Sequence, residues 1–362
     1  MKIHDMSRKS GASPNFTTRL LIGAALAGVV AIGFGSFPPA AQAQQAVKAL
    51  IAQAQPPVED LTVVKLRPNF YVIAGAGANI SVQVGPDGVL LVDAGSAAAS
   101  DKVIAAIKRL SDEPIRYIID TDAESDHVSG NGRVAKAGRN IQFTGTQALG
   151  GDAAAEFTNG FAATVLSTDT VLQRMSAPTG KTSPYPLTDW PEETFYQDRR
   201  YIYFNGEGVE MFRMPAAHSD ADIAVFFRAS DVVAAGDVID ATRFPVIDLK
   251  NGGSIQGEID ALNRIIRMTV SAIPFVYAHQ PGTYVIPGHG RVYEQLDVVA
   301  YRDMVVTIRD IIQDYIESGK TLEQVKTADP AGPWAGQYGR KTGDWTTDNF
   351  VEAIYKGLKG AK

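Results

Sequence analysis

The sequence contains no cysteine among its 362 residues. Disulfide bonds and thiolate metal ligands are therefore excluded from any site that this chain forms. Histidine is scarce as well, at five residues, so a pattern that involves several of them carries information. Lysine and arginine number 34 against 40 aspartates and glutamates, and they are not clustered. A chain without a basic patch is not expected to bind nucleic acid.

Long apolar runs are also absent, except near the beginning of the chain. A basic start that includes Arg8 and Arg19 precedes the uncharged apolar stretch 20–37, and a small-x-small sequence ends at Ala43. This order is typical of a secretory signal peptide, although an uncleaved anchor helix is the alternative. We expect residues 1–43 to be removed, leaving a periplasmic or secreted protein without a stable membrane anchor.

Strand and helix patterns alternate after a loose leader at 44–60. Apolar strands are expected at 61–66, 70–73, 80–84, 89–92, 115–119, 200–204, 209–213, 223–227, 232–235 and 284–286. Helices are expected from about Ser100, near Val134, at 255–268, at 298–316, and after the capping-box sequence that begins at Thr321. The stretch 150–190 shows no clear periodicity. Two strand-rich halves, each flanked by helices, predict a four-layer α/β arrangement.

Three of the histidines occur where apolar strands end, and acidic residues surround them. The positions are Asp122, Glu124, Asp126 and His127 in one loop, His218 in a second, Asp237 after a third strand, and His289 in Gly288-His289-Gly290. Loops at strand ends are where a rigid sheet presents catalytic groups. Carboxylates and imidazoles that converge there are the usual ligands of a metal site.

The order of these motifs resembles the metallo-β-lactamase superfamily, from about Phe70 to Gly290. That family has His-x-His-x-Asp-His after a strand, then a lone His, an Asp after an apolar strand, and a Gly-His. Asp93 in the strand 89–95 and Gly130-Asn131 also fit. The resemblance implies a four-layer αββα sandwich at 61–295 with a C-terminal helical extension at 296–362. It further implies a metal-dependent hydrolase with a small-molecule substrate and two divalent ions, which are zinc in most of the family.

The chain departs from the family's pattern at two positions, where Asp122 and Glu124 replace the first two histidines. The resemblance assigns seven ligands: Asp122, Glu124 and His218 at the first metal, Asp126, His127 and His289 at the second, and Asp237 as the bridge. It also implies that Asp126 orients the attacking hydroxide and that Asp93 steadies the motif loop by hydrogen bonding. The aromatic segment 184–191 is either a lid over the site or a surface crossing that buries Trp190.

The substituted carboxylates change the charge of the expected site. Four carboxylates cancel two divalent ions, whereas the family's usual set leaves about two positive charges. Oxygen ligands suit manganese or iron better than an all-imidazole site does. Glu124 also matches a position in flavodiiron proteins, so a di-iron redox protein is one alternative, and a non-catalytic binding protein is another. The sequence does not distinguish among ester, lactone, β-lactam and related bonds, and it leaves the oligomeric state open.

Overall fold

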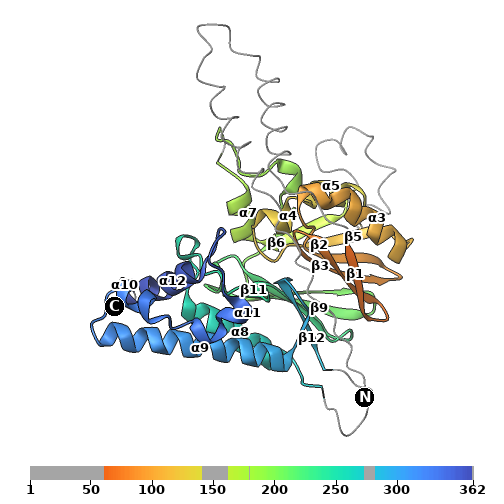
Figure 1. Cartoon of the computed structure of the whole chain (residues 1–362). Coiled ribbons are helices and arrows are strands. Elements are labelled where there is room, and N and C mark those ends of the chain that lie inside the picture. The colour runs from red at the N-terminus through yellow and green to blue at the C-terminus, as the bar shows by residue number, and fades with distance from the viewer. Residues whose placement is uncertain (1–60, 141–161, 179, 273–281, 361–362) are drawn as a thin grey trace, which may run out of the picture. The chain divides into compact units, whose positions relative to one another are not determined.

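We describe the chain from a computed structural model that covers residues 61–140, 162–178, 180–272 and 282–360 (Figure 1). The expected signal peptide at 1–43 and leader at 44–60 lie outside the described residues. Among the described helices, none is long and apolar enough to span a membrane.

The first sheet has seven strands in sequential order: β1 (Thr62–Arg67), β2 (Phe70–Ala76), β3 (Ala78–Gly85), β4 (Gly88–Val92), β5 (Ile115–Ile119), β6 (Thr164–Thr168) and β7 (Glu193–Phe195). The strands from β1 to β4 pair antiparallel, and those from β4 to β7 pair parallel, with Leu91 opposite Ile118. All five residues of β4 are buried, as an apolar strand inside a covered sheet should be.

The second sheet has six strands, in the order β13-β12-β11-β10-β9-β8. They are β8 (Arg199–Phe204), β9 (Glu207–Arg213), β10 (Ile223–Phe227), β11 (Val232–Asp240), β12 (Tyr284–His289) and β13 (Tyr293–Glu294). Only β11 and β12 pair parallel, and their register shifts around Gly236. The sequence predicted a strand at 232–235 here. The observed strand β11 continues to Asp240, because the pairing with β12 resumes after the register shifts and places Asp240 opposite His289.

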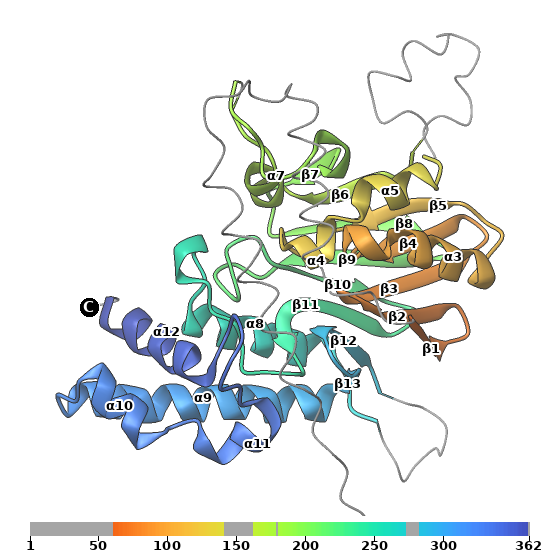
Figure 2. The same cartoon turned by 45° about the horizontal axis from the view of Figure 1, so that its top comes forward.

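The two sheets pack face to face through a shared apolar cluster. Phe70 of the first sheet contacts Phe227 of the second edge to face, with ring centroids 4.7 Å apart. A separate cluster packs α3 (Ser100–Leu110) and α5 (Asn131–Lys136) on the outer face of the first sheet. The outer face of the second sheet is covered by α8 (Ile255–Met268), α9 (Gln295–Glu317) and α12 (Thr347–Gly360). The predicted four-layer sandwich with C-terminal helices is therefore confirmed (Figure 2).

Shorter elements complete the described chain: α4 (Ser125–Val128), α7 (Asp169–Met175), α10 (Leu322–Ala328) and α11 (Ala335–Tyr338). The capping box predicted at Thr321 is confirmed, because the Thr321 hydroxyl oxygen accepts from the Gln324 backbone N–H while Gln324 Oε1 accepts from the Thr321 backbone N–H. The region 150–190, which lacked clear periodicity, contains β6 and α7. Five and seven residues are too few for a period to be recognised.

Candidate metal centre

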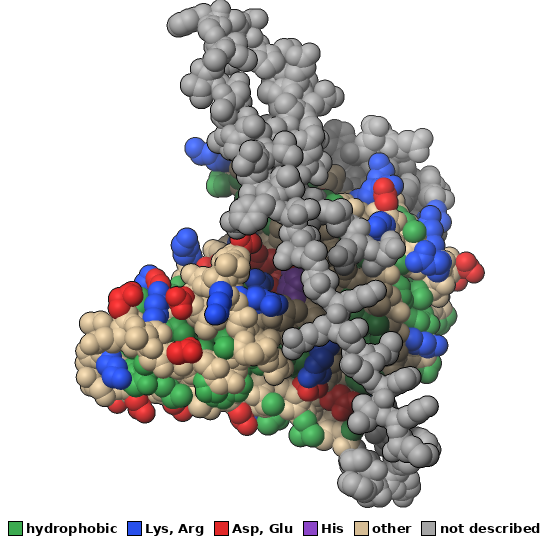
Figure 3. Space-filling view, viewed as in Figure 1, with side chains coloured by type: hydrophobic (Ala, Val, Ile, Leu, Met, Phe, Trp, Pro, Cys, Tyr) green, Lys and Arg blue, Asp and Glu red, His purple; other side chains and the backbone are tan. Residues whose placement is uncertain are grey.

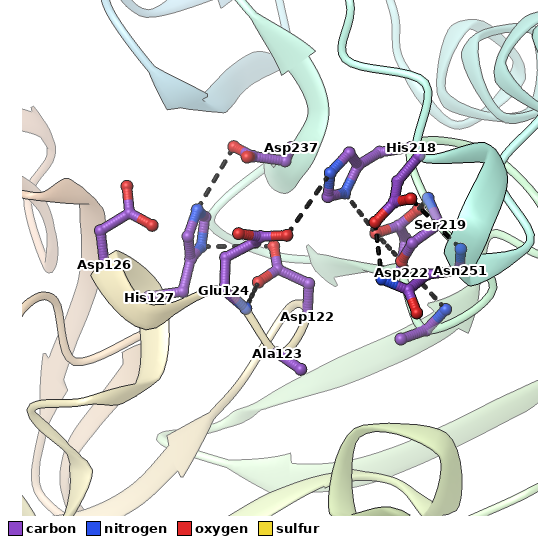
Figure 4. Close-up of polar contacts among 12 residues, drawn as sticks. Asp122, Ala123, Glu124, Asp126, His127, His218, Ser219, Asp222, Asp237 and Asn251 are labelled. Carbon is purple, nitrogen blue, oxygen red and sulfur yellow. Dashed lines mark hydrogen bonds and ion pairs between the residues drawn. The ribbon is translucent and has the colours of Figure 1, made fainter. Parts of the chain in front are cut away.

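The predicted site residues come from one edge of the sandwich, where strands of both sheets end. Asp93 follows β4, the loop from Asp120 to His127 follows β5, Asp237 lies in β11, and His289 ends β12. Figure 4 shows the side chains of the motif loop facing Asp237 and His218 across a common space. The sandwich therefore brings residues that are far apart in the sequence to one place.

His127 lies at the centre of this group and is fully buried. Its Nδ1 is 2.9 Å from Asp93 Oδ2 and 3.1 Å from Thr121 Oγ1. Its Nε2 faces Asp237 Oδ1 at 3.3 Å. Burial acts to lower the pKa of His127, but the carboxylates around it, Asp122 first, outweigh burial and raise that pKa. When Nδ1–H donates to the Asp93 carboxylate, a ring that has lost its second proton presents its lone pair on Nε2, the atom that a metal would bind.

Asp93 is itself fixed in place by the loop that it supports. Its backbone has a φ of 64°, which residues other than glycine rarely adopt. The Thr121 backbone N–H donates to Asp93 Oδ1 at 2.8 Å, and the Thr121 hydroxyl donates to Oδ2 at 2.9 Å. This arrangement holds the carboxylate against His127, which orients the imidazole.

His289 contacts both Asp126 and Asp237. His289 Nε2 lies 3.2 Å from Asp126 Oδ2 and 3.4 Å from Asp237 Oδ1. One ligand atom from each of Asp126, His127 and His289 lies within 4.8 Å of the others. A Cβ at Gly288 would stand 2.0 Å from Asp237 Oδ1, so the Gly-His motif needs a residue without a side chain there. Glycine lets the β12 backbone approach the carboxylate.

A second group of three ligand atoms, also within 4.8 Å, comes from Asp122, His127 and Asp237. Asp122 is buried, and its Oδ1 accepts a 2.7 Å bond from the Glu124 backbone N–H. Burial raises the pKa of Asp122 to about 8, and His127 opposes that rise. Burial also acts to raise the pKa of Asp237, but the positive charge that His127 and His289 can carry outweighs it and holds this pKa low.

Glu124 and His218 face each other away from those two groups. His218 Nε2 lies 3.8 Å from Glu124 Oε1, and the Glu124 side chain is 48% exposed. His218 Nδ1 is 3.2 Å from Asp222 Oδ1. Burial lowers the pKa of His218, but Asp222 overrides it and raises the value to about 10. Of the three residues assigned to the first metal, the structure thus pairs Glu124 with His218 and places Asp122 with His127.

Two residues beside the centre were not singled out from the sequence. Asp222 supports His218 as Asp93 supports His127, and it is anchored by the Ser219 backbone N–H at 2.5 Å. The sequence could have indicated Asp222 by its position, four residues after His218 and directly before a strand. The other is Tyr185, whose hydroxyl donates to the Ala123 carbonyl at 2.7 Å. Burial and then Glu124 raise the pKa of Tyr185 to about 12. The segment 184–191 therefore packs on the motif loop, with Trp190 partly buried.

The donor atoms present fit a divalent metal. His127 Nε2 and Asp237 Oδ1 are buried, and neither forms a hydrogen bond with any described residue. The two atoms instead face each other at 3.3 Å. Buried polar atoms that lack a well-formed hydrogen bond are rare, and a role as metal ligands is one reason for them. Three imidazoles and four carboxylates, without a thiolate, form a set that suits zinc, manganese or iron.

Comparison with known proteins agrees with this fold. The model of the metallo-beta-lactamase superfamily matches residues 74–329. The chain belongs to this superfamily. No curated protein sequence matches it. Among solved structures, it is similar to the stereoselective inverting sec-alkylsulfatase Pisa1 from Pseudomonas sp., with a TM-score of 0.57 and 11% identity over 82% of this chain and 50% of that one. The chain therefore spans about half the length of that sulfatase.

Two β-lactamase structures are less similar overall. The metallo-beta-lactamase from Pontibacter korlensis has a TM-score of 0.46 and 14% identity, and the match covers 68% of this chain and 98% of that protein. The DIM-1 metallo-beta-lactamase has a TM-score of 0.47 and 13% identity, with 69% and 99% covered. At such identities, the likeness to the sulfatase shows the fold alone.

Proposed function

We propose that this protein is a metal-dependent hydrolase of a small-molecule substrate, with the reaction centred on His127 and Asp237. The observation that carries the proposal is the pair of buried atoms His127 Nε2 and Asp237 Oδ1. They face each other at 3.3 Å without a well-formed hydrogen bond to any described residue, and they belong to ligand groups on the fold of this superfamily. Divalent ions held there would lower the pKa of a water molecule and stabilise negative charge on the substrate oxygen.

The residues of the chain supply orientation and protons around that centre. Burial acts to raise the pKa of Asp126, but His289 and His127 outweigh it and lower the pKa, so Asp126 is anionic at neutral pH. An anionic Asp126 accepts a hydrogen bond from the attacking water and orients it toward the substrate. Tyr185 stays protonated in this range, and its bond to Ala123 holds the segment 184–191 against the loop.

The proposed substrates carry an ester, lactone, β-lactam or related bond, sulfate esters included. We also propose that residues 1–43 direct export to the periplasm or beyond and are then removed. In this proposal, residues 61–295 carry the reaction, and 296–362 form the helical extension. N-terminal sequencing of the exported protein should begin at Gln44, whereas a start at Met1 would remove the export proposal.

The test of the function uses protein purified without chelators. Its hydrolysis of 4-nitrophenyl acetate, a lactone, a chromogenic β-lactam and 4-nitrophenyl sulfate is measured before and after metal removal. We expect at least one bond to be cleaved, the activity to be lost with the metal, and zinc, manganese or iron to restore it. Cleavage that survives complete metal removal would refute the proposal, and so would bound metal without cleavage of any of these bonds.

A further inference from the structure

Arg243 lies three residues beyond the end of β11, in a turn beside the end of β12, where His289 lies. Its Nε donates to Asp240 Oδ2 at 2.6 Å. Asp240 is buried, and its Oδ1 also accepts 2.7 Å bonds from the backbone N–H and the hydroxyl of Thr242. The Ala241 backbone N–H donates to the His289 carbonyl at 2.9 Å. The position of Arg243 is thus tied to the same backbone that positions a predicted metal ligand.

The packing of this turn leaves little freedom. Gly290 has a φ of +89°, and a Cβ there would stand 2.9 Å from Ala241 Cβ and Thr242 Cγ2. The turn therefore lies directly against the residue after His289. A rigid turn with an anchored Nε fixes the direction in which the guanidinium points.

The guanidinium of Arg243 is close enough to the metal centre to feel its charges. Burial acts to lower its pKa, but Asp240, and after it Asp237 and Asp126, raise the pKa, so the group stays charged. The side chain is 28% exposed. Figure 3 shows a small patch of histidine surface with acidic and basic side chains beside it. Arg243 thus supplies a positive charge near Asp237 and Asp126 on a side chain that solvent still reaches.

The two terminal nitrogens of Arg243 form no hydrogen bond with any residue of the described chain, unlike those of a structural arginine. Arg264 illustrates the difference, because its Nη1 and Nη2 donate to the two carboxylate oxygens of Asp198 at 3.1 and 2.7 Å. An arginine held by Nε alone presents its other donors as a fork that matches two oxygens of one oxyanion.

We propose that Arg243 is a specificity-determining residue that binds an oxyanion of the substrate, a carboxylate or a sulfate, beside the metal centre. The inference rests on the proposed function, because it places the substrate at that centre. Four site carboxylates would repel such a group, but two divalent ions cancel their charge. The charge of Arg243 then favours a substrate that carries a negative charge over a neutral one.

The test compares three esters with one leaving group: neutral 4-nitrophenyl butyrate, mono-4-nitrophenyl glutarate with a remote carboxylate, and 4-nitrophenyl sulfate. The variants are Arg243→Gln and Arg243→Lys. Arg302→Gln is the matched control, because Arg302 is also 28% exposed and also donates from Nε to a neighbouring aspartate, but lies on α9. Metal content is measured for each variant.

We expect Arg243→Gln to lower kcat/KM for at least one anionic ester, relative to the neutral ester, by about 10- to 100-fold, mainly through KM. Arg243→Lys should lose less, because it keeps the charge but not the fork. Arg302→Gln should leave the ratio unchanged. A lower kcat/KM for the glutarate ester identifies a remote carboxylate as the group that Arg243 binds. A lower kcat/KM for the sulfate ester identifies the sulfate that is cleaved. Ratios in Arg243→Gln equal to those of wild type for both anionic esters would overturn the proposal.

Binding distinguishes a failure of this inference from a failure of the hydrolase proposal. Monomethyl glutarate and inorganic sulfate are titrated calorimetrically into metal-loaded wild type and Arg243→Gln. Weaker binding in the variant at equal metal content supports the role of Arg243 even if no ester is cleaved. Equal binding, or no binding of either anion to wild type, overturns it. If Arg243→Gln does not fold, wild type must still favour an anionic ester or bind one of these anions, and the absence of both rejects the inference.

Discussion

The candidate metal centre has two ends, one around His127 and one around His218. Both ends orient a histidine in the same way, but they differ in how many other possible ligands lie near it. In each, a buried histidine directs Nδ1 to a fixed carboxylate: His127 to Asp93 at 2.9 Å and His218 to Asp222 at 3.2 Å. The opposite nitrogens meet different surroundings. His127 Nε2 is 3.3 Å from the buried Asp237, whereas His218 Nε2 is 3.8 Å from Glu124, which is half exposed.

This difference teaches that a metal site has two separate requirements: the histidine must be oriented, and other ligands must lie close to it. Both His127 and His218 are oriented by a carboxylate. Other possible ligands lie close to His127, which belongs to both groups of three ligand atoms. We infer that the end around His127 holds a metal more tightly than the end around His218. The predictions below weaken one end at a time, from the largest expected effect to the smallest.

The largest effect should come from His289→Ala or Asp126→Ala. Each removes a proposed ligand of the better assembled end, and Asp126→Ala also removes the group that we propose orients water. We expect hydrolysis to fall by about 100- to 1000-fold or more, with the fold retained, because neither residue is part of the apolar core. Steady-state kinetics and circular dichroism measure the two properties. Folded variants that keep their full activity would exclude this centre from the reaction.

An intermediate effect is expected when the carboxylates behind the histidines are neutralised. Asp93→Asn and Asp222→Asn each weaken the bond that orients one imidazole. Groups of this kind typically contribute about 10- to 100-fold in metal affinity. We expect Asp93→Asn to lie near the upper limit and Asp222→Asn near the lower one, in competition with a chromogenic chelator. The reverse order would contradict the inequality of the two ends.

Much of this centre could be predicted from the sequence, because strands carry a strong local signal. The predicted strands 115–119 and 223–227 coincide with β5 and β10, and the predicted helix 255–268 coincides with α8. Each is apolar at the spacing that its burial requires. Since these two strands were placed correctly, the loops after them could be placed at one edge.

The remainder depends on contacts between distant segments, for which a local pattern has no signal. Asp222 became interpretable only once His218 was seen beside it, and Arg243 only once the turn 241–243 was seen against His289. The pairing of Glu124 with His218, and of Asp122 with His127, is likewise a consequence of how two sheets pack. Motif order predicted which residues would gather but not which of them would touch.

The double variant Asp122→His, Glu124→His sharpens the comparison by restoring the family's histidines at both substituted positions, one beside His127 and one beside His218. It replaces two anionic ligands with neutral ones, so the site gains about two units of positive charge. Zinc should then be preferred there over manganese, because imidazole suits zinc. A water molecule at the site should become more acidic, which moves the pH-rate profile to lower pH. An unchanged metal preference and an unchanged profile would show that the two positions do not face a metal.

A smaller effect is expected from pH on metal uptake by the wild type. In the metal-free protein, Asp122 has a pKa raised to about 8 and His218 one raised to about 10. Below these values both are protonated, and a ligand must lose its proton before it binds a metal. Apparent affinity should therefore rise, and protons should be released, as pH increases from 7 to 10. Calorimetry in buffers of different ionisation enthalpy measures the release, and an affinity that falls over this range would contradict the assignment.

The central claim is that two unequal metal positions exist and that Glu124 serves the weaker one. The most direct test is the number of metal ions per chain in Glu124→Ala beside wild type, measured by elemental analysis after dialysis against a weak chelator. We predict that wild type retains two ions and that Glu124→Ala retains one, held as tightly as the tighter ion of wild type. Two ions retained in Glu124→Ala, or both lost, would contradict this account.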